Sequence, residues 1–205
     1  MYFVPVERFG VFDLSYDDAT GSAIIANGQG GLLESRDKGR SWRVAKWFSD
    51  GLTGLAVDPR AASTFYVLTS GGKIFKTTDR GASFVDLSSG FASFDRSYKN
   101  QNLAIDPLSG TLYLGSDYGL IRSRDAGFSW EGVPVIIPPE ALPVLSVAVH
   151  PNDSRIFFAS AQSQIYKTVD GGTSWSIVLS PTTRRVTKIV IDKNNTNRIY
   201  LLANR

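Results

Sequence analysis

Apolar residues along this chain form short runs of four or five, each ended by a turn residue, and the order of the runs repeats. In each unit the first run ends at Asp or His, the second is rich in β-branched and aromatic residues, and a third and a fourth run follow. Short, turn-bounded runs of this composition predict β-strands, and no window has a sustained helical periodicity. The first and second runs lie at 55–59 and 64–68, 103–107 and 111–114, 147–151 and 155–158, and 189–193 and 198–202.

One eight-residue phrase, Ser/Thr-x-Asp-x-Gly-x-Ser-Trp/Phe, occurs four times between the third and fourth runs of a unit. Its successive aspartates are 42, 46 and 45 residues apart. A phrase that recurs at such a period marks one supersecondary unit that is stacked repeatedly. Its Asp, Gly and aromatic positions are Asp37, Gly39 and Trp42, then Asp79, Gly81 and Phe84, then Asp125, Gly127 and Trp130, and finally Asp170, Gly172 and Trp175.

Four strands in each repeat is the size of a propeller blade. The predicted fold class is therefore all-β, a β-propeller of four-stranded antiparallel blades with strands A to D. The repeated phrase is the C–D turn, and the B–C and D–A connections lie at the opposite end of each blade. One propeller domain or arc is expected over residues 1–205, with blades at about 11–48, 52–88, 102–136 and 144–180 and a partial blade at 185–205.

The residue types of the repeated phrase suit a stabilising turn. An Asp carboxylate accepts hydrogen bonds from the N–H groups of its own turn, and Gly two places later adopts positive φ without steric cost. The closing Trp or Phe supplies a large apolar face to pack beneath the turn. A catalyst needs one active site, whereas this phrase occurs in four near-copies, so we interpret its aspartates as structural.

The phrase closely resembles the Asp-box, or bacterial neuraminidase (BNR), repeat, and the resemblance covers nearly the whole chain. Asp-box propellers include sialidases, xyloglucan-cleaving glycoside hydrolases, sortilin-type receptors and the photosystem II stability/assembly factor group. The short period and residues 167–175, KTVDGGTSW, look most like the last two groups and their bacterial relatives. The resemblance implies an extracytoplasmic protein, periplasmic, secreted or surface-anchored, with a protein or peptide partner, or else a glycan ligand.

The number of blades has two interpretations. Residues 185–205 supply only strands A and B of a fifth unit, so the chain is either a piece of a propeller of six to eight blades or a five-bladed ring. In the second case, Tyr2–Val6 would pair with the last blade. A half-blade leaves open strand edges, which stable β proteins pair, cover or blunt. We favour the first interpretation.

Composition excludes several kinds of chemistry. The 205 residues contain no Cys, which excludes a disulfide framework and a thiolate zinc site, and the single His150 occupies a turn position where other repeats have Asp. No cofactor or metal is therefore expected. A net charge of +3 without a concentrated basic patch gives no support for nucleic-acid binding. The sequence has neither a signal-type segment at its start nor an apolar run of membrane-spanning length.

The loop at 88–101 differs most from its counterparts in the other repeats. It is longer, and it carries three aromatic residues beside Arg, Lys, Asn and Gln. Aromatic and Arg side chains on a loop suit recognition of a peptide or sugar, although Phe91 and Phe94 would equally serve to pack the loop against its blade. Candidate binding residues on this loop and on neighbouring loops at the same end are Phe91, Phe94, Arg96, Tyr98, Tyr118, Pro138, Pro139, Arg184 and Arg185.

No catalytic residues are predicted. The arginine motif that sialidases carry near the start has no counterpart here, and the chain has only four Glu. A glycosidase needs two carboxyl groups facing one groove, and the candidates at the B–C and D–A end follow no spacing rule. We therefore expect a non-catalytic binding or scaffold propeller, with a glycan-binding or glycoside-hydrolase-type propeller as the alternative. The candidate carboxyl groups are Asp50, Asp95, Asp117 and Glu140.

Overall fold

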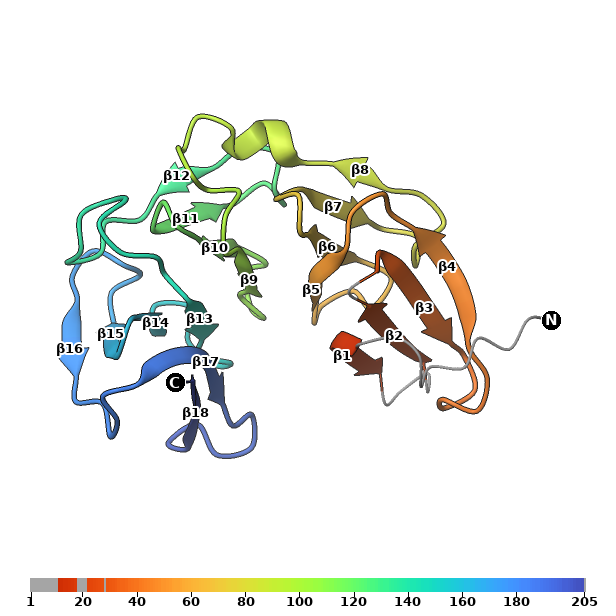
Figure 1. Ribbon diagram of the computed structural model, residues 1–205. Coiled ribbons are helices and arrows are strands. Elements are labelled where there is room, and N and C mark those ends of the chain that lie inside the picture. Colours follow the sequence, from red (N-terminus) through yellow and green to blue (C-terminus); the bar gives the residue numbers. More distant parts are fainter. Residues whose placement is uncertain (1–10, 18–21, 28, 205) are drawn as a thin grey trace. The chain divides into compact units, whose positions relative to one another are not determined.

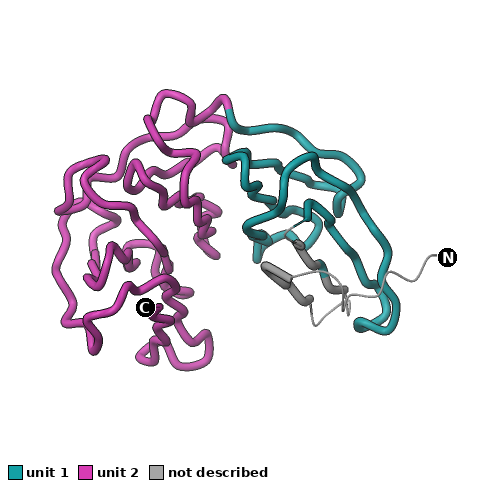
Figure 2. Tube along the Cα trace, viewed as in Figure 1, with its two compact units in different colours: residues 1–88 teal, residues 89–205 magenta. Residues whose placement is uncertain are grey.

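The computed structural model describes residues 11–17, 22–27 and 29–204. They form four four-stranded antiparallel sheets and one two-stranded sheet, with strands adjacent in the order of the chain (Figure 1). The segment Tyr2–Val6 and Gly28 lie outside the described residues. By contact, the chain divides into unit 1, residues 1–88, and unit 2, residues 89–205 (Figure 2).

Unit 1 contains two of the four-stranded sheets. Sheet 1 consists of β1 (Val11–Asp17), β2 (Ser22–Asn27), β3 (Gly31–Ser35) and β4 (Arg43–Trp47), and sheet 2 consists of β5 (Leu52–Val57), β6 (Phe65–Thr69), β7 (Ile74–Thr77) and β8 (Val85–Asp86).

Unit 2 begins within a short 3-10 helix, η2 (Ser88–Phe91), in a segment predicted to be a loop. Two four-stranded sheets and the two-stranded sheet follow. Sheet 3 consists of β9 (Asn102–Ile105), β10 (Leu112–Gly115), β11 (Leu120–Ser123) and β12 (Glu131–Gly132); sheet 4 of β13 (Ser146–Val149), β14 (Phe157–Ala161), β15 (Gln164–Thr168) and β16 (Ser176–Val178); and sheet 5 of β17 (Arg185–Ile191) and β18 (Ile199–Asn204).

The core of each unit lies between neighbouring sheets. In unit 1, Leu32 of sheet 1 packs with Phe65 and Val67 of sheet 2. In unit 2, Tyr113 of sheet 3 packs with Phe157 of sheet 4. The second strands β6, β10 and β14 lie between two strands of their own sheet and are buried along their whole length, whereas the outer strands β8, β12 and β16 are short and mostly exposed. Antiparallel four-stranded sheets packed in this way are propeller blades, and the predicted fold class is confirmed.

The repeated turns share one hydrogen-bond pattern. In the third copy, the Asp125 carboxylate accepts from the backbone N–H of Ser129 at 2.8 Å and from its hydroxyl at 2.5 Å, while Gly127 N–H donates to Ser123 Oγ at 2.8 Å. The other three copies repeat these bonds through Asp37, Asp79 and Asp170. Each turn thus ties the end of its third strand to the start of its fourth.

The aspartates of the repeated phrase have low pKa values. Hydrogen bonds from the Ser hydroxyl and, second in size, from the Ser backbone N–H lower the pKa of Asp125 from 3.8 to about 2. The corresponding aspartates of the other three turns have the same shift from the same causes. These hydrogen bonds stabilise the ionised form of the carboxyl group, which is the form present in the folded turn above about pH 4.

Acid is expected to destabilise the fold through these turns. Because the folded pKa lies below the unfolded value of 3.8, the stabilising contribution is complete above the unfolded pKa and is lost as the pH falls from about 4 to about 2. Urea unfolding over this pH range should therefore show a smaller loss of stability for Asp125→Asn and for Ser129→Ala than for the unmodified chain. An equal pH dependence in all three proteins would contradict the assignment.

Candidate functional site

The loop at 88–101 is a series of consecutive turns held by its own backbone and by buried Ser97. Phe94 N–H donates to Phe91 O at 3.1 Å, and Ser97 N–H donates to Phe94 O at 3.2 Å. The Ser97 hydroxyl, in a residue that is 2% exposed, donates to Phe91 O at 3.2 Å, and Gln101 Nε2 donates to Ser97 O at 3.0 Å. The loop therefore has a fixed shape, on which exposed side chains can be presented in one arrangement.

Asp117, in the turn between β10 and β11, anchors this loop to sheet 3. Its carboxylate accepts from Arg96 Nη2 at 3.1 Å and from Asn100 Nδ2 at 2.6 Å, and its backbone N–H donates to Lys99 O at 3.0 Å. Arg96 and Asn100 both have left-handed backbones, with φ of 58° and 52°, and Asp117 is 8% exposed. Both donor residues adopt this unusual backbone conformation, and both bind the same nearly buried carboxylate. The role of Asp117 here is therefore to hold the loop.

The aromatic residues of the loop have different positions. Phe91 is 2% exposed and meets Trp130 edge to face with 6.1 Å between ring centroids, so it supports the loop from beneath. Phe94 is half-buried and meets Tyr118 edge to face at 5.1 Å. Tyr98 is 51% exposed, with Lys99 Nζ 5.5 Å from its ring. Of the three, Phe94 and Tyr98 have accessible surface.

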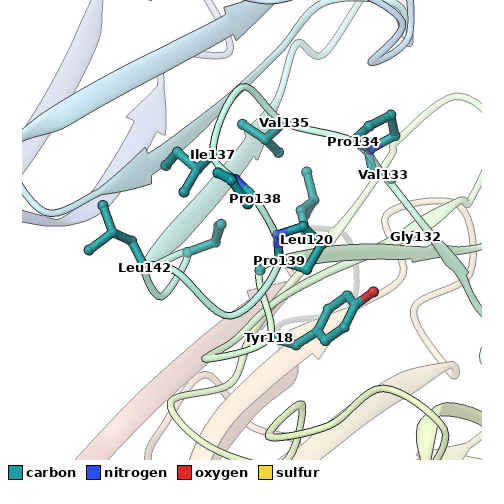
Figure 3. Close-up of a pocket in the computed structure, with 12 residues that line it drawn as sticks. Tyr118, Leu120, Gly132, Val133, Pro134, Val135, Ile137, Pro138, Pro139 and Leu142 are labelled. Carbon is teal, nitrogen blue, oxygen red and sulfur yellow. The ribbon is translucent and has the colours of Figure 1, made fainter.

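A pocket of about 190 Å³ lies beside Tyr118, between sheet 3 and the loop that joins it to sheet 4. Figure 3 shows the Tyr118 ring on one side of the pocket and the side chains of Val135, Ile137 and Leu142 on another. The lining contains no charged side chain. The residues that line the pocket are Tyr118, Gly119, Leu120, Gly132, Val133, Pro134, Val135, Ile137, Pro138, Pro139, Leu142 and Val144.

The wall of the pocket formed by residues 133–144 is tied to both sheets of the site. Glu140 N–H donates to Tyr118 O at 2.7 Å, and Val144 N–H donates to Ser116 O at 3.0 Å. The Trp175 indole N–H, from the fourth repeated turn, donates to Pro134 O at 2.8 Å. The pocket and the 88–101 loop thus share Tyr118 and the β10–β11 turn, and we treat them as one candidate site, the Tyr118 site.

The structure brings together some of the sequence-predicted residues and separates others. Phe94, Tyr118, Pro138 and Pro139 belong to the Tyr118 site, and Arg96 borders it through Asp117. Arg184 and Arg185 are exposed, and among the described residues no hydrogen bond or ion pair joins either of them to this site. Sequence reasoning missed Val135, Ile137 and Leu142, for which the signal was present as apolar residues interleaved with four prolines at 134, 138, 139 and 143.

The four candidate glycosidase carboxyl groups have different surroundings. Asp50 lies in unit 1, and its carboxylate packs against Gly71, where an added Cβ would lie 2.6 Å from Asp50 Oδ2. Asp95 is exposed and accepts from Arg96 N–H, Asp117 is held by the 88–101 loop, and Glu140 is exposed on the pocket wall. None of the four lines the pocket, so the pocket holds no acid–base pair of the kind that glycoside hydrolysis needs.

No family model matches this sequence, and no curated protein matches it. Solved structures do match. The chain is similar to the GH74 enzyme of Niastella koreensis, with 20% identity and a TM-score of 0.71 over 91% of this chain and 32% of that one. It is similar to YCF48 bound to D1 peptide, with 14% identity and a TM-score of 0.73 over 98% of this chain and 64% of that one. The GH74 xyloglucanase of Xanthomonas campestris matches at 17% identity and a TM-score of 0.58, over 95% and 44% of the two chains.

At these identities the comparisons show only the fold, which is that of a β-propeller. The chain spans less than two thirds of the length of each of these structures. They include glycoside hydrolases and a peptide-bound protein, so the fold does not choose between the two functions. Within the described residues, no helix has the length and apolar composition needed to cross a membrane.

Proposed function

We propose that this chain is a non-catalytic binding module of an Asp-box propeller and that it recognises a protein or peptide partner through the Tyr118 site. The observation that carries the proposal is the pocket, which is lined by apolar side chains and one tyrosine and contains no carboxyl group. Binding pockets combine apolar walls with a few polar groups that orient the ligand, whereas hydrolysis requires an acid and a base or nucleophile at the bond that breaks.

Two further observations support a peptide ligand. The 88–101 loop is fixed by Asp117, so the exposed ring of Tyr98 and the half-buried ring of Phe94 are held in position before a partner arrives, which lowers the entropic cost of binding. YCF48, which has the same fold, is described as bound to D1 peptide. The repeated Asp, Gly and aromatic positions support the Asp-box assignment, and with it an extracytoplasmic location.

Phe94→Ala tests the proposal. Loss of the ring removes the edge-to-face contact with Tyr118 and with it apolar contact area of the Tyr118 site, so peptide binding should weaken about tenfold, which corresponds to about 1.4 kcal/mol. The probe is a panel of capped octapeptides with varied central residues, titrated while amide shifts are followed by NMR. Tyr200→Ala is the matched control, because this aromatic residue of β18 is 49% exposed and lies in the same unit. Absence of binding by every peptide, or equal weakening in both variants, would reject the proposal.

The second candidate function is glycan binding or glycoside hydrolysis, and the GH74 structures are the specific observation that favours it. It requires turnover of a xyloglucan oligosaccharide that is abolished in Asp117→Asn or Glu140→Gln. In the present structure the Asp117 carboxylate already accepts from Arg96 and Asn100, which leaves little of it available to a substrate. Turnover lost in either amide variant would establish the glycosidase function in place of the peptide-binding one.

A further inference from the structure

The volume of the pocket sets the size of its occupant. At about 190 Å³ the cavity is slightly larger than the apolar cavity of about 150 Å³ that holds one benzene molecule in an engineered protein. Sites for drug-sized ligands are about 300–1,000 Å³. The pocket therefore has room for one large side chain, of the size of leucine or phenylalanine, and not for several sugar rings.

The chemistry of the walls favours an apolar occupant. Tyr118 supplies the one polar side chain of the lining. Several backbone carbonyls around the pocket already accept hydrogen bonds within the chain, among them Tyr118 O from Glu140 N–H, Pro134 O from the Trp175 indole and Pro138 O from Ala141 N–H. Water in such a pocket has few partners, and its replacement by a hydrocarbon group is favourable.

The wall is also stiff. Prolines at 134, 138, 139 and 143 fix φ at four positions, and bonds to Tyr118 and Trp175 hold the segment at two further points. Ile136 is 54% exposed between Val135 and Ile137, both of which line the pocket, so apolar surface continues outward from it. A preformed wall of this kind loses little conformational entropy when a ligand enters.

One carboxylate on this wall has no ionic partner among the residues that the structure describes. Glu140 follows Pro139 of the lining directly, has a left-handed backbone with φ of 65° and is exposed. It forms no ion pair with any described residue, whereas nearby Asp117 is paired with Arg96. The carboxylate of Glu140 is therefore available to a cation of the partner.

On the basis of the proposed peptide-binding function, we infer that the partner carries a large apolar residue next to a lysine or arginine. The apolar side chain enters the pocket against Tyr118, Val135 and Leu142. The neighbouring basic side chain meets Glu140 at the rim, where an exposed ion pair contributes to selectivity more than to affinity.

The experiment compares four capped octapeptides whose two central residues are leucine–lysine, phenylalanine–lysine, alanine–lysine and leucine–glutamate. The first two should bind, and alanine–lysine should bind at least about tenfold more weakly because most of the buried hydrocarbon is gone. Gly132→Val should abolish the advantage of leucine over alanine. A Cβ at Gly132 meets nothing closer than the Tyr118 hydroxyl at 4.0 Å, so the added methyl groups occupy pocket space without a clash at the Cβ.

Two further variants separate the parts of the inference. Glu140→Gln should remove the preference for leucine–lysine over leucine–glutamate and keep the preference for leucine over alanine. Leu179→Ala, at a residue that is 93% exposed on another loop, should change neither. Equal binding of leucine–lysine and alanine–lysine, or a lysine preference that persists in Glu140→Gln, would overturn the inference while Phe94-dependent binding still upholds the proposed function. Absence of binding by all four peptides would overturn the inference, and the full panel then decides the function.

Discussion

Phe157→Ala is expected to lower the free energy of unfolding by about 3–5 kcal/mol, the range for removing a buried phenylalanine. Phe157 begins β14 and is 0% exposed. Its ring lies 4.7 Å from that of Tyr113 in sheet 3 and 5.2 Å from that of Trp175, between centroids. Removal of the ring leaves a cavity between sheets 3 and 4 that stiff strands on both sides cannot close.

Phe128→Ala is the matched control, because it deletes the same ring from a residue that is 60% exposed. Its effect should stay within about 0.5 kcal/mol, as for surface substitutions in general. Urea denaturation followed by tryptophan fluorescence measures both, since Trp175 contacts the Phe157 ring. Similar losses in the two variants would mean that Phe157 does not occupy the core between these sheets.

Much of the fold could be predicted because its stabilising features are local and repeated. The second-strand residues Phe65 and Phe157 belong to β-branched and aromatic runs, and both are fully buried in the structure. The aspartates of the repeated phrase form hydrogen bonds with residues within four positions, so a single eight-residue phrase contains both donor and acceptor. Each strand also pairs with the strands next to it in sequence, and the period of the repeat predicts this pairing.

The turn geometry holds one feature that the repeated phrase does not reveal. The residue before the glycine of the repeated phrase also has a left-handed backbone conformation, with φ of 62° at Lys38, 58° at Arg80 and 61° at Ala126. In sequence, only the fourth copy marks this position, since Gly171 stands there with φ of 77°. Side chains with a Cβ are held at these angles because the Asp carboxylate and the Ser or Thr hydroxyls fix the backbone on both sides.

The Tyr118 site was less predictable because its contacts join residues distant in sequence. From the sequence, Asp117 is predicted to be a turn residue, whereas its hydrogen-bond partners Arg96 and Asn100 lie 21 and 17 positions earlier. The pocket combines Tyr118 with Gly132 and a loop that ends at Val144. No periodic pattern encodes such pairings. Loop composition singled out the 88–101 loop, but only the folded arrangement separates buried Phe91 from accessible Phe94.

The second large effect is expected at Gly172, in the fourth copy of the repeated phrase. Its φ is 93°, and a Cβ there would lie 2.9 Å from Val133 Cγ1 and 3.2 Å from Phe157 Cζ. Gly172→Ala should therefore combine a left-handed strain of about 1–3 kcal/mol with an overpacking cost of about 1–3 kcal/mol. Val133 also lines the pocket, so its displacement should weaken binding of the leucine–lysine peptide.

Gly171→Ala separates the backbone strain from the overpacking cost. Gly171 also has positive φ, 77°, but an added Cβ there meets no atom within 4 Å. It should show the strain alone and leave peptide binding unchanged. Urea denaturation of both variants gives the overpacking cost as the difference between their unfolding free energies. Equal destabilisation would show that the contact of Gly172 with Val133 and Phe157 relaxes freely, and the fourth turn would then stabilise its blade without constraining the pocket wall. A larger loss for Gly172→Ala, together with weaker binding, would establish that this turn supports both the fold and the Tyr118 site.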